Sequence, residues 1–287
     1  MDQGKMLSGE KVKGKLSKAT SKEIVLTNTR GAIEEITAFN PDFAFFQEVD
    51  TNSTRSFQVN QFKMLQESLA KMASVHVSNF HSAYLFYPIL DPHGVVNSGI
   101  ATFSKYKIDK VIRKSLEITD AFPSKFFDLD RCFSASYLKT NHDNYLVIVN
   151  VHLSAYDKGG VYRKKQLQQL NSFLEVEYQK GNYVVCGGDF NHDIANSMYV
   201  FETKQEKPEW VYALNNDDLN ENFSFATNNN IPTCRSTDMP YEKNVNYTVV
   251  LDGFIVSKNV DVIMVENVDT NFEYSDHNPV YMKFVLK

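Results

Sequence analysis

Short apolar runs that end in polar or acidic residues recur along the chain. A continuous apolar run of four to eight residues is typical of a buried strand. Three such runs end in this way: Phe43–Phe46 before Glu48, the β-branched run Tyr145–Leu153 around His152, and Tyr183–Cys186 before Asp189. The third run continues through Gly187 and Gly188, which allow the backbone a tight turn or a close approach. The pattern predicts buried strands that carry polar side chains at their ends.

Helical periodicity predicts three helices between these strands. The first spans Ser21–Phe39 and stops at Asn40–Pro41, because a residue before proline avoids helical angles. The second spans Phe62–Met72, and the third begins after Gly159–Gly160 and ends before Gly181, which suits a helix C-cap.

The remaining apolar runs predict further strands, several of which follow one another directly. A long segment, Ala195–Asn246, has no clear periodicity and should contain a short helix or strand. This order favours a mixed sheet, or two packed sheets covered by helices, over a purely doubly wound fold. The further strands are Tyr84–Tyr87 and Gly99–Phe103 on either side of a polar loop 91–98, Cys132–Leu138, Tyr247–Val256 with an interruption at Asp252–Gly253, and Val280–Val285.

Composition indicates an ordinary soluble globular chain. It has 287 residues, of which 43% are hydrophobic and 23% charged. Residues 1–20 are polar and Lys-rich, which predicts an N-terminal arm, and we expect residues 21–287 to form a single domain. No apolar segment approaches the ~20 residues that span a bilayer, so we expect no stable membrane insertion.

Charge and cysteine content narrow the function classes. The net charge of −5 argues mildly against a long duplex nucleic acid as ligand. A local basic cluster, Lys158 with Arg163–Lys165, is either a contact surface or a solvated helix start. The three cysteines are widely spaced, which favours a reducing compartment and hence the cytoplasm. No obligate protein partner is expected.

The polar strand ends gather a set of side chains suited to phosphate chemistry. Carboxylates with an amide are hard oxygen ligands for Mg²⁺ or Mn²⁺, whereas no spacing supports a zinc site. Histidine beside a buried aspartate can hold a charged imidazole, and a positioned carboxylate can prepare water for attack. The set favours hydrolysis of a phosphate ester, and its members are Glu48, His152, Asp189, Asn191, Asp252, Asp276 and His277.

Six segments, in order, resemble the motifs of the endonuclease/exonuclease/phosphatase superfamily. The resemblance implies a four-layered α/β sandwich, a mixed α+β arrangement with two packed mixed sheets flanked by helices and the site at one edge of the sheets. It runs from about Pro41 to the C-terminus. The segments are DFAFFQEVD from Asp42, NSGIATFSK from Asn97, NVHLS from Asn150, GGDFN from Gly187, LDGFIVS from Leu251 and SDHNP from Ser275.

The resemblance also implies roles for individual residues. Glu48 resembles the metal-binding glutamate, and Asp276 a further metal or water ligand. Asp189 resembles the aspartate near the attacking water and Asn191 the amide that orients phosphate or water. His277 resembles the catalytic histidine paired with Asp252, and His152 the histidine that contacts phosphate. Further candidates for substrate contacts, against ordinary surface or structural roles, are Arg131, Tyr156, Lys158, Arg163 and Arg235.

One feature of the family pattern is missing. The family begins with a strand that ends in an asparagine near the metal, whereas Met1 here leads into the polar arm and the first helix. Asn28 lies within that helix and is not assigned the role. We therefore expect an unpaired edge or a gap in the sheet.

Two functions from different classes follow. The first is a Mg²⁺- or Mn²⁺-dependent phosphoesterase, either a nuclease or a phosphodiesterase of small molecules or lipids. Its substrate would be a nucleic acid, a phospholipid head group or a sugar or inositol phosphate. The second is a non-catalytic module on the same scaffold that binds a phosphate ligand with a weakened site.

Overall fold

The computed structural model describes residues 18–86, 92, 94–118, 130–155 and 161–287. Its elements, in chain order, are α2 (Lys22–Thr37), β1 (Phe43–Asp50), the 3-10 helix η1 (Thr54–Ser56), α3 (Gln61–Ser68), β2 (Ala73–Leu85), β3 (Gly94–Ser104), β4 (Lys110–Ser115), β5 (Cys132–Lys139), β6 (Tyr145–His152), α4 (Val161–Gln179), β7 (Tyr183–Asp189), the 3-10 helix η3 (Asn216–Asp218), β8 (Phe223–Ala226), β9 (Cys234–Arg235), β10 (Thr248–Val249), β11 (Asp252–Ser257), β12 (Val260–Asn267) and β13 (Val280–Leu286).

A six-stranded sheet carries most of the core, in the order β4-β5-β6-β7-β11-β8. Strands β6 and β7 are parallel and their neighbours are antiparallel, so the sheet is mixed. Alternate residues of β7 face opposite sides: Val184 and Cys186 pack with Leu170 of α4, whereas Val185 belongs to a separate cluster on the other face. This sheet is therefore apolar on both faces, as its continuous runs predict.

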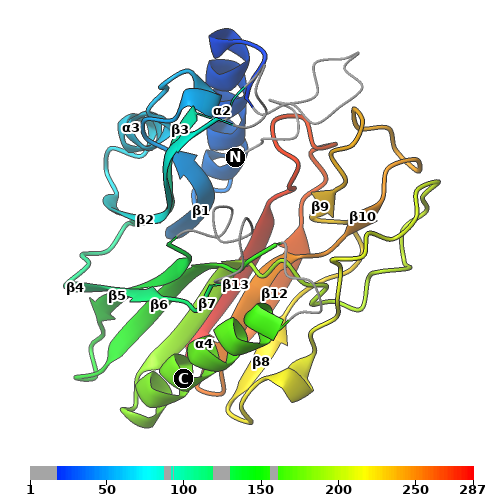
Figure 1. The fold of residues 1–287 in the computed structure, drawn as a ribbon. Helices are drawn as coiled ribbons and strands as arrows, with labels where there is room; N and C mark the ends of the chain where they lie inside the picture. Colours follow the sequence, from blue (N-terminus) through cyan, green and yellow to red (C-terminus); the bar gives the residue numbers. More distant parts are fainter. Residues whose placement is uncertain (1–17, 87–91, 93, 119–129, 156–160) are drawn as a thin grey trace.

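The second sheet layer is made of β1-β3-β2 and the hairpin β12-β13. Ala44 and Phe46 of β1 pack with Ile33 of α2 and Leu65 of α3. Phe45 of β1 points the other way and joins the cluster that lies against the six-stranded sheet. Figure 1 shows α2 and α3 on the opposite side of the molecule from α4. The four layers are helix, sheet, sheet and helix, which confirms the predicted sandwich.

In the described residues, β1 and β13 share no ladder, so the second layer consists of two separate pieces. Ring contacts bridge the two pieces instead: the centroids of Phe43 and Phe284 are 6.4 Å apart, and those of Phe39 and Tyr281 are 5.3 Å apart.

Several elements differ from the predicted bounds. Strand β2 begins at Ala73, well before Tyr84, and β3 begins at Gly94 within the predicted loop 91–98. Helix α3 ends at Ser68 rather than Met72, and β4 and β12 were not predicted. Some polar residues of β2 and β3 face the interior, since Asn79 and Ser98 are buried. Hydropathy alone does not identify strands whose buried positions are polar.

The long segment 195–246 is mostly irregular, as predicted, and contributes only η3, β8 and β9. The run Tyr247–Val256 is divided into two strands, but the break lies at Val250–Leu251 rather than at Asp252–Gly253, because β10 ends at Val249 and Asp252 and Gly253 belong to β11. Among the residues that the structure describes, no helix combines the length and the apolarity needed to cross a bilayer.

Candidate active site

Strand register places three predicted site residues in one row across the six-stranded sheet. His152 of β6 is the partner of Asp189 in the parallel ladder, and Asp252 of β11 is the partner of Asp189 in the antiparallel ladder. Nε2 of His152 lies 3.6 Å from Oδ2 of Asp189. The carboxyl end of β7 is thus flanked on both sides by groups that can exchange protons.

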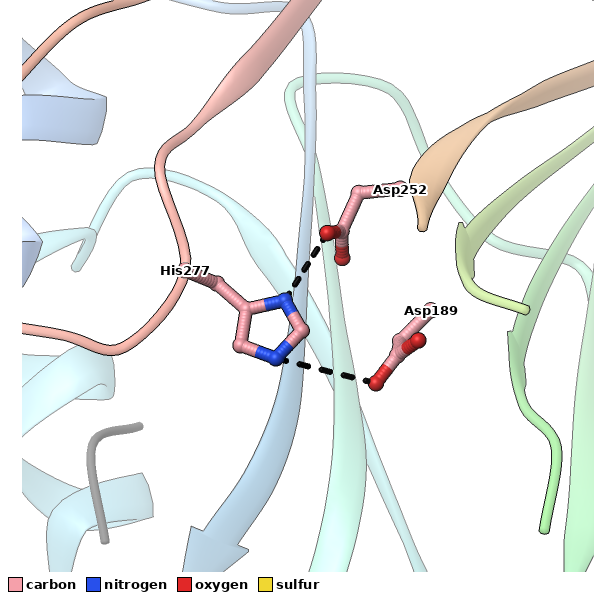
Figure 2. A group of neighbouring side chains, drawn as sticks. All are labelled: Asp189, Asp252 and His277. Atoms are coloured by element: carbon pink, nitrogen blue, oxygen red, sulfur yellow. Dashed lines mark hydrogen bonds and ion pairs between the residues drawn. The ribbon is translucent and has the colours of Figure 1, made fainter. Parts of the chain in front are cut away.

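His277 completes this row from the loop before β13. A backbone bridge between His277 and Cys234 fixes the loop, and the His277 amide donates to Oγ of Ser275 at 3.1 Å. Nδ1 of His277 lies 2.8 Å from Oδ2 of Asp252, and Nε2 lies 4.0 Å from Oδ2 of Asp189 (Figure 2). An Asp252 carboxylate at Nδ1 holds the ring in the orientation that aims Nε2 at Asp189.

Two of the side chains in Figure 2, Asp189 and His277, have strongly perturbed pKa values. Burial, together with the negative charge of Asp252, raises the pKa of Asp189 to about 7. Burial alone would lower the pKa of His277, but the charge of Asp252 and its hydrogen bond raise it well above the ordinary range. Near neutral pH the site therefore holds a protonated imidazole beside a carboxyl group that gains and loses its proton readily.

His152 is buried and favours the neutral form. Burial and the positive charge of Arg131 lower its pKa well below the ordinary value. Nδ1 of His152 lies 3.5 Å from Nδ2 of Asn79 on β2. A neutral ring between an arginine and an aspartate is suited to a hydrogen bond with a phosphoryl oxygen rather than to an ion pair.

Glu48 enters the site from the other sheet through a bulge in β1. The register of β1 against β3 shifts between Phe46 and Val49, and Glu48 has φ +53°. A bulge re-aims a side chain, and positive φ in a non-glycine residue is a local cost that concentrates at functional sites. The negative charge of Glu48 contributes to the raised pKa of Asp189 and partly opposes the lowering of the pKa of His152. The three groups therefore share one region.

A hydrogen bond fixes the β1 bulge against the six-stranded sheet, and a glycine in that sheet allows a close approach of β6 and β7. Nε2 of Gln47 donates to Oδ1 of Asn150 at 2.8 Å, and Nδ2 of Asn150 donates to the Ala101 carbonyl at 2.9 Å. Gly188 has φ +144°, and a Cβ atom there would lie 2.1 Å from the Val151 carbonyl oxygen. Only glycine allows the strands to approach so closely beside Asp189.

Asn191 follows Asp189 in a tight turn with φ +50°. Its backbone amide donates to Oδ1 of Asp189 at 2.7 Å, and its Nδ2 donates to the Leu153 carbonyl at 2.8 Å. The side chain of Asn191 is buried, and its hydrogen bond connects the end of β7 to the end of β6. Asn191 therefore orients the Asp189 carboxylate directly.

Asp276 lies next to His277 and close to two arginines. Its carbonyl accepts a hydrogen bond from the Arg235 backbone amide at 3.1 Å. The charge of its carboxylate raises the pKa of Arg55 on η1, to which Glu48 also contributes. The two predicted metal ligands, Glu48 and Asp276, thus act on the same guanidinium.

The predicted substrate-binding residues occupy different environments. Arg131 lies beside His152, as its effect on that ring shows. Arg235 is buried beside Asp276, and its Nη1 donates to the Ser236 carbonyl at 3.1 Å. Tyr156 and Lys158 lie outside the described residues.

Arg163 is fully buried, whereas the charge pattern of the sequence suggests an exposed helix start. Its Nη1 donates to the carbonyls of Asn191 and Trp210, at 3.2 and 2.8 Å, and its guanidinium lies 5.0 Å from the Tyr212 ring centroid. These contacts fix the loop after β7. The start of α4 is therefore packed against that loop, although its charge suggests a solvated surface.

The donors present fit a divalent cation. Carboxylate oxygens of Asp189 and Asp252 lie within 4.8 Å of each other beside the ring of His277, which is protonated and offers no lone pair, and the charge of Glu48 reaches this group. Carboxylate oxygens are the ligands that Mg²⁺ and Mn²⁺ prefer. The raised pKa of Asp189 has the negative charges of Asp252 and Glu48 among its causes, and a bound cation would offset that charge.

Sequence reasoning missed two polar residues at the site, Asn79 and Arg55. Asn79 precedes the strand predicted from Tyr84, because β2 begins earlier, at Ala73. The signal for the earlier start is the alternation of Val75 and Val77 with polar residues, which is typical of a half-buried strand. Arg55 lies in an irregular segment, and no local pattern connects it to Glu48.

Comparisons with known proteins identify similar sequences and folds. Residues 26–277 match the family model described as "Endonuclease/Exonuclease/phosphatase family". An inositol phosphosphingolipids phospholipase C from Schizosaccharomyces pombe is 24% identical over 245 residues, which cover 75% of this chain and 58% of that protein. The chain therefore spans less than two thirds of this curated relative.

Solved structures share the fold. The human Nocturnin catalytic domain with bound sulfate superposes with a TM-score of 0.59 at 17% identity, covering 91% of this chain and 87% of that chain. The mannosyl-6-phosphatase of Bacteroides thetaiotaomicron superposes with a TM-score of 0.58 at 16% identity, covering 91% and 92%. At these identities the likeness confirms the architecture.

Proposed function

The chain belongs to the endonuclease/exonuclease/phosphatase family, and from this premise we propose that it is a divalent-metal-dependent hydrolase of phosphate esters. The observation that carries the proposal is the arrangement of His277 between Asp252 and Asp189, with Nδ1 held at 2.8 Å and Nε2 facing a buried carboxyl group at 4.0 Å. A single domain over residues 21–287 carries the activity, in a cytoplasmic setting that suits three buried free cysteines.

Asp189 serves in proton transfer and His277 in charge stabilisation. Asp189 accepts a proton from the attacking water, because a carboxyl group with a pKa of about 7 is a better base than an ordinary aspartate. His277, protonated and paired with Asp252, places positive charge at Nε2 where a phosphoryl oxygen gains negative charge. Asn191 fixes the Asp189 carboxylate, and His152 donates to a second phosphoryl oxygen.

Glu48 and Asp276 would hold Mg²⁺ or Mn²⁺. When bound, the ion draws negative charge from a phosphoryl oxygen and helps to orient the ester. Arg131, beside His152, extends the positive charge towards the substrate. Arg235 lies beside Asp276 and supports that side of the site.

The substrate is a phosphate ester of small or single-ended form. The relative from Schizosaccharomyces pombe is named as acting on inositol phosphosphingolipids, and this supports a lipid or inositol phosphodiester among the candidates. A net charge of −5 disfavours a long duplex nucleic acid. Sugar phosphates and single-stranded nucleic acid ends are the other members of the same class.

The test compares hydrolysis by the wild-type chain with that of Asp189→Ala and His277→Ala. Bis(p-nitrophenyl) phosphate, p-nitrophenyl phosphate and an inositol phosphosphingolipid serve as substrates with Mg²⁺, with Mn²⁺ and with a chelator. We expect each substitution to lower kcat by about 10²-fold or more, while thermal unfolding stays cooperative. His142→Ala, an exposed histidine in the β5–β6 turn, is the matched control and should leave kcat unchanged.

Undiminished hydrolysis in both variants would refute the proposal. The alternative, a non-catalytic module with a weakened site, predicts no hydrolysis of any substrate by the wild-type chain. Titration calorimetry with Mn²⁺ separates this alternative further, because a weakened scaffold would lack a saturable site.

A further inference from the structure

A partly buried cation lies beside the predicted metal ligand Glu48. Arg55, on η1, has its Nη2 3.6 Å from Oε2 of Glu48. The same guanidinium forms a two-point contact with Asp50: Nε donates to Oδ2 at 3.0 Å and Nη2 donates to Oδ1 at 2.8 Å. A third hydrogen bond runs from Nη2 to Oγ of Ser98 at 3.3 Å. Paired contacts of this kind fix both the position and the plane of a guanidinium.

The Asp50 carboxylate that holds Arg55 is itself part of a rigid frame. Asp50 is 1% exposed, and its backbone amide donates to Oε1 of Gln61 at 2.9 Å. Nε2 of Gln61 in turn donates to Oγ1 of Thr29 at 3.0 Å. This chain of contacts joins β1, α3 and α2, so the guanidinium of Arg55 is anchored to the helical layer of the fold.

Glu48 differs from Asp50 in its exposure. Its side chain is 35% exposed, against 1% for Asp50, and its backbone lies in the bulge with φ +53°. Ordering a partly exposed acidic side chain costs conformational entropy. A fixed positive group 3.6 Å from one of its two oxygens contributes to that ordering.

We propose that Arg55 is the positioning residue of Glu48: held by Asp50, it orients the Glu48 carboxylate so that the second oxygen is presented to a divalent cation. The inference rests on the proposed function, because it assigns Glu48 to the metal. In this role Arg55 acts through Glu48.

Two physical effects of Arg55 oppose each other, and this makes the inference testable. As a positive charge near the site, Arg55 repels a divalent cation, so its removal would tighten metal binding if charge alone mattered. As an orienting partner it lowers the cost of ordering Glu48, so its removal would weaken metal binding. Loss of a group that orients a metal ligand typically reduces metal affinity by about 10- to 100-fold.

The experiment is titration calorimetry with Mn²⁺ in the absence of substrate. We expect Arg55→Gln to raise the Kd for Mn²⁺ at least about tenfold and Arg55→Lys, which keeps the charge but loses the paired contact, to give a smaller increase. Arg55→Gln leaves a buried carboxylate without its partner, so the double variant Asp50→Asn/Arg55→Gln, which removes both charges, guards against loss of the fold. It should melt cooperatively and still show the raised Kd. Lys63→Gln, an exposed lysine on α3, controls for the change in net charge.

A second comparison shows whether Arg55 acts through Glu48. In a Glu48→Gln background, adding Arg55→Gln should give no further increase in the Kd. An unchanged or lower Kd in both Arg55→Gln and the double variant, with a saturable site in the wild type, would overturn this inference and leave the proposed function intact. A wild-type chain without any saturable Mn²⁺ site would overturn both.

Discussion

Replacing Asp189 with asparagine should stabilise the metal-free protein, and the stabilisation should be larger at pH 8 than at pH 5. Asp189 is buried beside a second carboxylate, and these surroundings raise its pKa from 3.8 to about 7. At pH 5 the folded group is protonated and neutral, whereas the unfolded group is largely ionised, so part of the destabilisation is already present. At pH 8 it is a buried anion, and asparagine removes that charge while it keeps the shape of the side chain.

The sign follows from proton binding. Between about pH 4 and pH 7 the folded chain holds the Asp189 proton whereas the unfolded chain has released it, so stability falls as pH rises through this window. The full difference between pKa values of 3.8 and about 7 corresponds to about 4 kcal/mol. Asparagine also removes the anion that faces Nε2 of His277 at 4.0 Å, which reduces the gain. We expect a net stabilisation of about 2–4 kcal/mol at pH 8, or roughly 4–8 °C in Tm for a chain of this size.

The assay is thermal unfolding followed by circular dichroism in a chelating buffer at pH 5, 6, 7 and 8. The quantity compared is the Tm of Asp189→Asn minus that of the wild type, which should increase steadily with pH. Asp193→Asn is the control, because that buried carboxylate accepts hydrogen bonds from Ser197 and Met198 and its loss should destabilise the chain at every pH. A Tm difference that is the same at pH 5 and pH 8, or larger at pH 5, would refute the reasoning.

Three further outcomes follow from the same structure. Asp252→Asn should lower the pKa of His277, because it removes the anion at Nδ1, and an NMR titration of the ring measures the change; an unmoved titration would contradict the pairing. Gly188→Ala should destabilise by about 3 kcal/mol or more, since its Cβ would meet the Val151 carbonyl, whereas Gly181→Ala, with open space around it, should cost less in the same denaturant titration. Mg²⁺ should raise the Tm of the wild type more at pH 8 than at pH 5, because the cation competes with the Asp189 proton; equal shifts would argue against a cation near Asp189.

Most of the site could be predicted from the sequence because its residues lie at the ends of strands. A β6–β7 ladder in parallel register aligns His152 with Asp189, and antiparallel pairing of β7 with β11 aligns Asp189 with Asp252. Each of these polar residues adjoins an apolar run that identifies its strand, so local patterns were sufficient. The fold was predictable for the same reason, and the motif resemblance supplied the order of the layers.

The rest depended on contacts between segments that have no sequence signal in common. Asn79 reaches His152 across 73 positions of the chain, from a strand whose buried residues are polar. Arg163 carries a charge that suggests exposure, yet its hydrogen bonds to two backbone carbonyls allow it to be buried. In both residues the side chain is hydrogen-bonded by a partner that only tertiary structure brings near, and composition cannot indicate such a partner.

The pairing of charges explains why the site can remain negative without a bound cation. Each of two cations has its own carboxylate at 2.8 Å: His277 is paired with Asp252, and Arg55 with Asp50. Each cation lies farther from a second acid: the distance is 4.0 Å from His277 to Asp189 and 3.6 Å from Arg55 to Glu48. Because interaction energy falls with distance and with solvent exposure, neither cation neutralises those acids fully. The uncompensated charge accounts in part for the raised pKa of Asp189, and it is the property that a site for a divalent ion requires.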